Sequence, residues 1–200
     1  GEGAASPTRR LPRDLFELYG FGIGARLQRA EAASRAVPGV LWEAFQAVAV
    51  ANQLTGRRSF SQHDAEDALA GRPAALRAWK QLLEEARDGR ARMPLVKALH
   101  TDRSGKASAF RLEHHSLQEA LFVHALVDDQ VPEFWDSEEL VKARLEDPFF
   151  SHVWVLGEGH LGEALARQWP ELRLRGPLAA PGRASLARLL AGAASLRALD

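Results

Sequence analysis

Two adjacent histidines, His114 and His115, precede an apolar segment and are followed by the polar side chains of Ser116, Gln118 and Glu119. A neutral imidazole can donate one hydrogen bond to a phosphate oxygen, and a protonated imidazole forms a charge-assisted bond that is about twice as strong. Such a cluster could therefore distinguish between ligands that carry different phosphate groups. A lone histidine that caps or packs at a buried junction is the commoner case, so this alternative stays open.

The neighbouring residues indicate how the backbone positions this cluster. Phe110, Leu112 and His114 alternate with the period of a β-strand and should share one face. Ser116 and Glu119 have the spacing of a capping box, in which Ser116 is the N-cap of a helix. The sequence therefore predicts a buried strand-to-helix junction with His114 beside it.

Upstream of this junction the sequence predicts several helices. Asp14 is a possible N-cap of the first, and an apolar pattern predicts the second over residues 40–54. Ser61 and Asp64 form a variant of the capping box at the start of a short helix over residues 62–70.

A fourth helix and a hairpin complete this half. Pro73 can occupy the first position of a helix whose apolar stripe extends to Ala86. Two apolar segments, residues 93–99 and 107–112, are joined by residues 101–106, which have the composition of a hairpin turn. Helices followed by a hairpin are typical of a winged helix.

Downstream, the pattern predicts an all-helical packing domain. The apolar helix that follows the junction should end at Asp128 and Asp129, and residues 137–145, 149–156 and 160–169 each predict a short helix.

The last residues have a different pattern. Trp169-x-x-Leu172 recurs as Leu196-x-x-Leu199, with a helix-like segment at residues 185–191 between them. This spacing is typical of a leucine-rich repeat, in which each unit pairs a strand with a helix. The chain begins at Gly1 without a methionine and stops within this pattern, so we expect it to be part of a longer protein.

Composition limits the classes of function. The chain has 200 residues and is 46% hydrophobic, which is enough to bury a substantial core. Lys plus Arg and Asp plus Glu number 26 each, so the chain has no net positive charge that would favour the binding of nucleic acid. Neither a membrane span nor a signal peptide is expected, and the sequence contains no cysteine, which agrees with a cytoplasmic protein. The histidines lack the spacing of a zinc site, so no metal is expected.

Residues 110–119, which read Phe-x-Leu-x-His-x-Ser-Leu-Gln-Glu, resemble the end of the winged-helix domain in NACHT-type STAND NTPases, the nucleotide-switched family that includes NOD-like receptors. The resemblance implies a mainly α fold with a small β-hairpin. Its winged helix and helical domain would lead into an α/β leucine-rich-repeat solenoid. The implied domains are the end of helical domain 1 (1–36), the winged helix (37–115), helical domain 2 (116–168) and the first leucine-rich repeat (169–200).

The resemblance also implies a site. In the family, the histidine at this junction contacts the β-phosphate of bound ADP and holds the closed state, and the matching position is His114 rather than His115. Ser116, Gln118 and Glu119 would support the junction. ATP or ADP would be bound mainly outside this chain, by an upstream nucleotide-binding domain in cis. The active state would self-oligomerise, and the leucine-rich repeats would bind an unknown ligand or protein.

No catalysis is expected within the chain, because it has no glycine-rich P-loop with a lysine. Two other functions stay open. The chain could be a leucine-rich-repeat interaction scaffold that is independent of nucleotide. More remotely, residues 157–162 (Gly-Glu-Gly-His-Leu-Gly) match an NADP-binding fingerprint if residues 153–156 form a strand. A DNA-reading role is not favoured, since residues 73–87 mix acidic with basic side chains.

Overall fold

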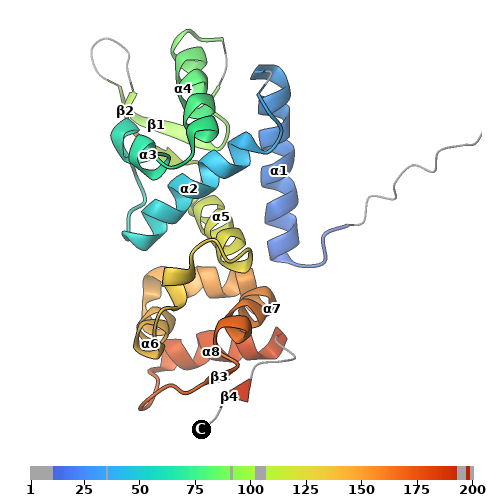
Figure 1. Cartoon of the computed structure of the whole chain (residues 1–200), viewed down its shortest axis with the longest axis vertical. Helices are drawn as coiled ribbons and strands as arrows, with labels where there is room; N and C mark the ends of the chain where they lie inside the picture. Colours follow the sequence, from blue (N-terminus) through green and yellow to red (C-terminus); the bar gives the residue numbers. More distant parts are fainter. Residues whose placement is uncertain (1–10, 35, 91, 102–106, 193–196, 199–200) are drawn as a thin grey trace, which may run out of the picture.

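The computed structural model describes residues 11–34, 36–90, 92–101, 107–192 and 197–198. The described chain is mainly helical with a small antiparallel hairpin, as the sequence predicted. Helices α1 to α4 and the hairpin β1–β2 form one half, helices α6 to α8 form the other, and α5 connects them (Figure 1). The elements are α1 (Leu15–Ser34), α2 (Val40–Leu54), α3 (Gln62–Ala68), α4 (Pro73–Arg87), β1 (Val96–Thr101), β2 (Ala107–Leu112), α5 (His115–Val127), α6 (Glu138–Glu146), α7 (Ser151–Gln168), β3 (Glu171–Leu172), α8 (Ala180–Gly192) and β4 (Arg197–Ala198).

The predicted helix starts of the first half are confirmed. The Asp14 carboxylate accepts a hydrogen bond from the main-chain nitrogen of Glu17 at 2.8 Å, which caps α1. Ser61 and Asp64 form the reciprocal capping box of α3. Pro73 occupies the first turn of α4. These residues stabilise helix ends through contacts within four residues, so their effect can be deduced from the sequence.

The hairpin is a two-stranded antiparallel sheet. Val96 pairs with Leu112 and Ala98 with Phe110, and bulges interrupt the register beyond Ala98. Phe60 bridges to Phe110 through two main-chain hydrogen bonds of 2.8 and 2.9 Å, on the edge of β2 that faces away from β1. The first strand begins at Val96 and not at Met93 as predicted. Of the turn predicted at residues 101–106, Thr101 is the last residue of β1, and residues 102–106 lie outside the described residues.

A continuous hydrophobic core joins the two halves. In the first half, Trp79 packs edge-on against Phe45, with 5.6 Å between ring centroids. Helix α5 packs against both α2 and α7, and Leu121 and Phe122 in its middle are fully buried. A helix that is apolar around most of its circumference requires partners on several sides. Helix α5 is therefore the central element of the fold.

In the second half, the break predicted between the helices at 149–156 and 160–169 is present as a kink within α7. Glu158 has a non-helical backbone (φ 30°, ψ −119°) that bends the helix within residues 157–162. Residues 153–156 are helical. The NADP-binding alternative required a strand at residues 153–156. That strand is not formed, because these residues belong to the first turns of α7.

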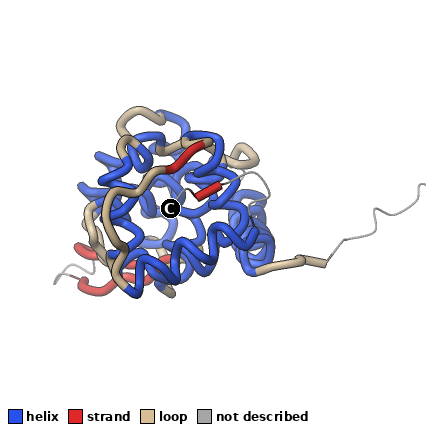
Figure 2. Tube along the Cα trace, turned by 90° about the horizontal axis from the view of Figure 1, so that it is seen from below, coloured by secondary structure: helices blue, strands red, loops and turns tan. Residues whose placement is uncertain are grey.

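A strand–helix–strand unit ends the described chain. Strands β3 and β4 run parallel, with Glu171 opposite Arg197 and Leu172 opposite Ala198, and α8 lies between them in sequence. Figure 2 shows these short strands among the helices at this end of the molecule. Leu196 and Leu199 of the predicted repeat lie outside the described residues. None of the described helices has the length and apolar character that a membrane crossing requires.

Candidate functional site

The predicted strand-to-helix junction is present, but the prediction of a capping box formed by Ser116 and Glu119 is wrong. The backbone stays extended through His114 (φ −135°, ψ 145°), and α5 begins at His115, with the main-chain nitrogen of Leu117 donating to the His114 carbonyl at 3.1 Å. His114 therefore occupies the N-cap position, and Ser116 lies inside the first turn, where it is half-buried. Glu119 is a further turn along the helix, too far to reach back to the N-cap nitrogen.

Glu119 instead faces the interior and joins three parts of the fold. One of its carboxylate oxygens accepts from the Arg58 guanidinium at 3.0 Å, and the other lies 2.7 Å from Nδ1 of His152. The Glu119 side chain is only 5% exposed. The Arg58 guanidinium also lies over the Phe149 ring, 4.2 Å from its centroid. This buried carboxylate ties α5 to the segment after α2 and to α7.

Gln118 provides a second tie at the same end of α5. It is buried, and its amide nitrogen donates to the Gln53 side-chain oxygen at 2.9 Å and to the Arg57 carbonyl at 3.0 Å. Both partners belong to the C-terminal end of α2 and the residue stretch that follows it. Gln118 and Glu119 thus hold the start of α5 against α2.

Glu113 ties the junction to α1 and to the residue before β1. Its carboxylate pairs with Arg26 of α1 at 2.7 Å, and its main-chain nitrogen donates to the Leu95 carbonyl at 2.8 Å. Leu112, the last paired residue of β2, is buried, whereas His114 is exposed. The prediction that His114 shares one face with Phe110 and Leu112 is therefore wrong in its environment, since His114 lies beyond the end of the sheet and is exposed while the other two are buried.

Ser116, Gln118 and Glu119 lie in the first turns of α5, next to His114. The sequence did not identify Gln53, Arg58 and His152 as the partners of Gln118 and Glu119, or Arg26 as the partner of Glu113. Arg58 and Glu119 are 61 residues apart, and His152 lies 33 residues beyond Glu119. No local pattern connects such positions, so only the fold could identify them.

A separate aromatic cluster fixes α1 against α5 and α7. The rings of His124 and His160 both stack on Phe16, at centroid distances of 4.0 and 4.3 Å, and Nε2 of His160 lies 2.9 Å from the Asp14 carboxylate. Burial lowers the pKa of His124, although the nearby carboxylate of Asp128 and main-chain hydrogen bonding with Phe16 oppose the shift. The uncharged imidazole of His124 is therefore the form that suits this interface.

The residues that the structure describes contain no group of three or more His, Asp or Glu side chains arranged to hold a metal ion. The site is thus an exposed imidazole on an anchored junction, with neighbours that are hydrogen-bonded to α1, α2 and α7. Such an arrangement can donate a hydrogen bond to an anionic oxygen of a partner. Comparison with protein-family models, with curated proteins and with solved structures finds no match to this chain.

Proposed function

We propose that this chain is the regulatory part of a NACHT-type, nucleotide-switched signalling NTPase, in which His114 senses ADP held by an upstream nucleotide-binding domain of the same polypeptide. The observation that carries the proposal is the exposed imidazole of His114 on a main chain that is hydrogen-bonded on both sides. A phosphate oxygen is a suitable acceptor for that imidazole. The upstream domain would bring the ADP phosphates to the junction in the closed state.

The anchoring of the junction favours a selective contact. Glu113 is bonded to Leu95 and Arg26, while Gln118 and Glu119 hold the first turns of α5. A donor on a main chain that is already fixed loses no backbone conformational entropy when it binds. Couplings between ligand and domain arrangement of about 1–3 kcal/mol correspond to about 5- to 150-fold in affinity. One well-placed hydrogen bond to phosphate has the energy required.

The order of the elements supports the domain assignment. Helices α2, α3 and α4 precede the hairpin β1–β2, which is the order expected of a winged helix over residues 37–115. The parallel pairing of β3 with β4 around α8 favours a first leucine-rich repeat after residue 169. Helical domain 2 would then comprise α5, α6 and α7, and the repeats would bind the ligand or protein that is sensed.

The exposed side of α4 argues against a DNA-reading winged helix. Lys80 pairs with Glu66 at 3.4 Å, and Gln81 donates to Glu85 at 2.8 Å. A recognition helix requires a stripe of unpaired cations for phosphates, whereas α4 mixes its cations with the carboxylates of Glu84 and Glu85. The hairpin and α4 would instead serve contacts within the protein.

The test is the size distribution of the full-length polypeptide in ADP, measured by light scattering after size-exclusion chromatography. His114→Ala removes the proposed contact between the imidazole and the ADP phosphate, so this variant should self-associate more than the parent in ADP. His115→Ala is the matched control, since this neighbouring histidine is also exposed and begins α5. The proposal is wrong if His114→Ala stays in the same oligomeric state as the parent, or if both variants associate equally. A nucleotide-independent scaffold predicts partner binding that ADP and ATP leave unchanged.

A further inference from the structure

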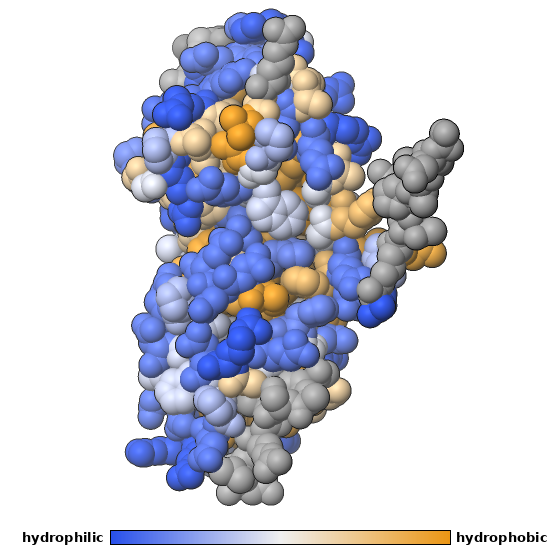
Figure 3. Space-filling model, turned by 45° about the vertical axis from the view of Figure 1, so that its right-hand side comes forward, coloured by the Kyte–Doolittle hydropathy of each residue, from blue (hydrophilic) through white to orange (hydrophobic). Residues whose placement is uncertain are grey.

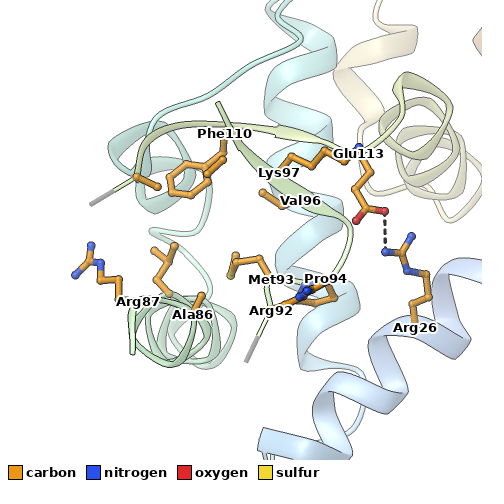
Figure 4. Close-up of a pocket in the computed structure, with 13 residues that line it drawn as sticks. Arg26, Ala86, Arg87, Arg92, Met93, Pro94, Val96, Lys97, Phe110 and Glu113 are labelled. Atoms are coloured by element: carbon orange, nitrogen blue, oxygen red, sulfur yellow. Dashed lines mark ion pairs between the residues drawn. The ribbon is translucent and has the colours of Figure 1, made fainter. Parts of the chain in front are cut away.

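A cleft of about 640 Å³ lies between α4 and the hairpin, with α1 at one end. Its residues come from α4, from the segment before β1, from both strands and from Arg26 of α1 (Figure 4). Pockets that bind small molecules typically have volumes of roughly 300–1,000 Å³. The junction residue Glu113 lines the cleft, but His114 does not.

The middle of the cleft is apolar. Figure 4 shows Phe110 and Met93 pointing into the space between them from opposite sides, with Ala86 of α4 and Val96 of β1 nearby. Phe110 and Val96 are buried, whereas Met93 and Ala86 are half-buried. An apolar surface that is only partly covered favours an apolar body that would exclude the remaining water.

The charges at the rim are predominantly positive. Arg26, Arg87, Arg92 and Lys97 line the cleft, and Glu113 is the one carboxylate among its described lining residues. Glu113 is already neutralised by Arg26 at 2.7 Å. Arg87 donates to the neutral side chain of Gln62 at 3.0 Å, and within the described part of the chain neither Arg92 nor Lys97 has a carboxylate partner. The cleft therefore has uncompensated positive charge beside an apolar floor.

We infer that this cleft binds a small amphipathic anion. The apolar body of the ligand, aromatic or aliphatic, lies between Phe110 and Met93, and its carboxylate, phosphate or sulfonate group pairs with Lys97 and Arg92. Charge-assisted hydrogen bonds to such groups are among the strongest that a partly enclosed site can offer. This inference does not depend on the proposed nucleotide switch, because it uses no contact of His114.

A small molecule fits this cleft better than an extended peptide. A peptide would have to pair along β1, but bulges between Ala98 and Thr101 limit the regular register to Val96, Lys97 and Ala98. Such interruptions at a strand edge oppose the addition of a further strand. A small molecule in the cleft needs no strand pairing, so the bulges of β1 do not oppose its binding.

The first probe is 8-anilinonaphthalene-1-sulfonate, an aromatic anion that fluoresces when its rings leave water, titrated into the folded chain and displaced with decanoate. Displacement by decanoate should be at least about tenfold more effective than displacement by decyltrimethylammonium, which has the same chain length and the opposite charge. Calorimetry with decanoate alone gives the stoichiometry, for which we expect one site.

Two variants locate the site. Lys97→Glu should weaken decanoate binding about tenfold or more, since it replaces a pairing cation with a like charge. Ala86→Trp should block binding by filling the cleft, with circular dichroism as the check of folding. Arg77→Glu is the matched control, because Arg77 is an exposed cation of α4 that lies outside the cleft, and its affinity should stay within about twofold of the parent.

The inference is overturned by any of three results. One is the absence of decanoate binding by calorimetry at millimolar concentration. Another is binding that Lys97→Glu and Arg77→Glu weaken equally, because a general loss of positive charge would then explain it. The last is equal displacement of the probe by decanoate and by decyltrimethylammonium, which would mean that the cations of the rim play no part.

Discussion

Replacement of Glu119 by alanine tests whether the junction is held by a buried carboxylate. The Glu119 side chain is 5% exposed and contacts both Arg58 and His152, whose side chains are 29% and 46% exposed. Removing one partner of a buried ion pair costs about 3–5 kcal/mol. Water can reach both of the partners that remain, so we expect a loss at the lower end of that range, about 3 kcal/mol.

Glu113→Ala is the comparison. Its ion pair with Arg26 has a similar length, 2.7 Å, but the two side chains are 24% and 38% exposed. Exposed ion pairs contribute about 0–1 kcal/mol. The two variants should therefore differ by about 2 kcal/mol or more, although each removes one carboxylate from the same junction.

Thermal unfolding followed by circular dichroism at pH 7 measures both losses. For a chain of this size, 1 kcal/mol shifts the melting temperature by about 2–4 °C, so Glu119→Ala should melt about 6–12 °C below the parent. The melting temperature of Glu119→Gln should lie between those of Glu119→Ala and the parent, because the amide oxygen can still accept a hydrogen bond from Arg58. Equal losses for Glu119→Ala and Glu113→Ala would refute the argument from burial.

Two further predictions concern the contact between α1 and α5. A Cβ atom at Gly20 would lie 2.7 Å from Nε2 of His124, whose ring is stacked on Phe16, so Gly20→Ala should lose about 1–3 kcal/mol of stability relative to Gly22→Ala, which meets no atom within 4 Å. Chemical denaturation of both variants measures the difference, and equal stabilities would contradict it. Burial lowers the pKa of His124 in the folded chain, with the nearby Asp128 opposing, so its contribution to stability is present above about pH 6.5 and is lost as the pH falls below that value. His124→Phe should therefore flatten the fall of the melting temperature between pH 7.5 and 5, and an unchanged slope would contradict the assignment.

The sequence was sufficient where a structure depends on near neighbours. The predicted caps at Asp14 and Ser61 each accept a main-chain hydrogen bond from a residue three positions ahead, and short-range patterns identify such contacts reliably. The apolar periodicity likewise predicted α2 with both of its ends. The hairpin was predicted because alternation and turn chemistry are also local signals.

The sequence was insufficient where a side chain has a distant partner. Ser116 and Glu119 have the spacing of a capping box, but the distant partners Arg58 and His152 favour a buried orientation of Glu119, and the helix begins at His115. The cleft could not be predicted for the same reason, since its lining combines α1, α4 and the hairpin.

The surface illustrates the same limit. The face in Figure 3 is mostly hydrophilic, with small apolar areas separated by polar side chains. On α1, the exposed apolar residues Leu15 and Leu18 belong to the same helical pattern as the buried Ile23 and Leu27. Periodicity identifies such a helix but does not determine which of its apolar residues the rest of the fold covers.

The central claim is that His114 holds ADP in the closed state, and the dissociation rate of ADP from the full-length polypeptide tests it most directly. A fluorescent ADP analogue is loaded, chased with excess unlabelled ADP, and followed for the parent, His114→Ala and His115→Ala. Loss of one hydrogen bond to phosphate, about 1.5–3 kcal/mol, should accelerate release by about 10- to 150-fold in His114→Ala only. Equal release rates for all three proteins would contradict the claim.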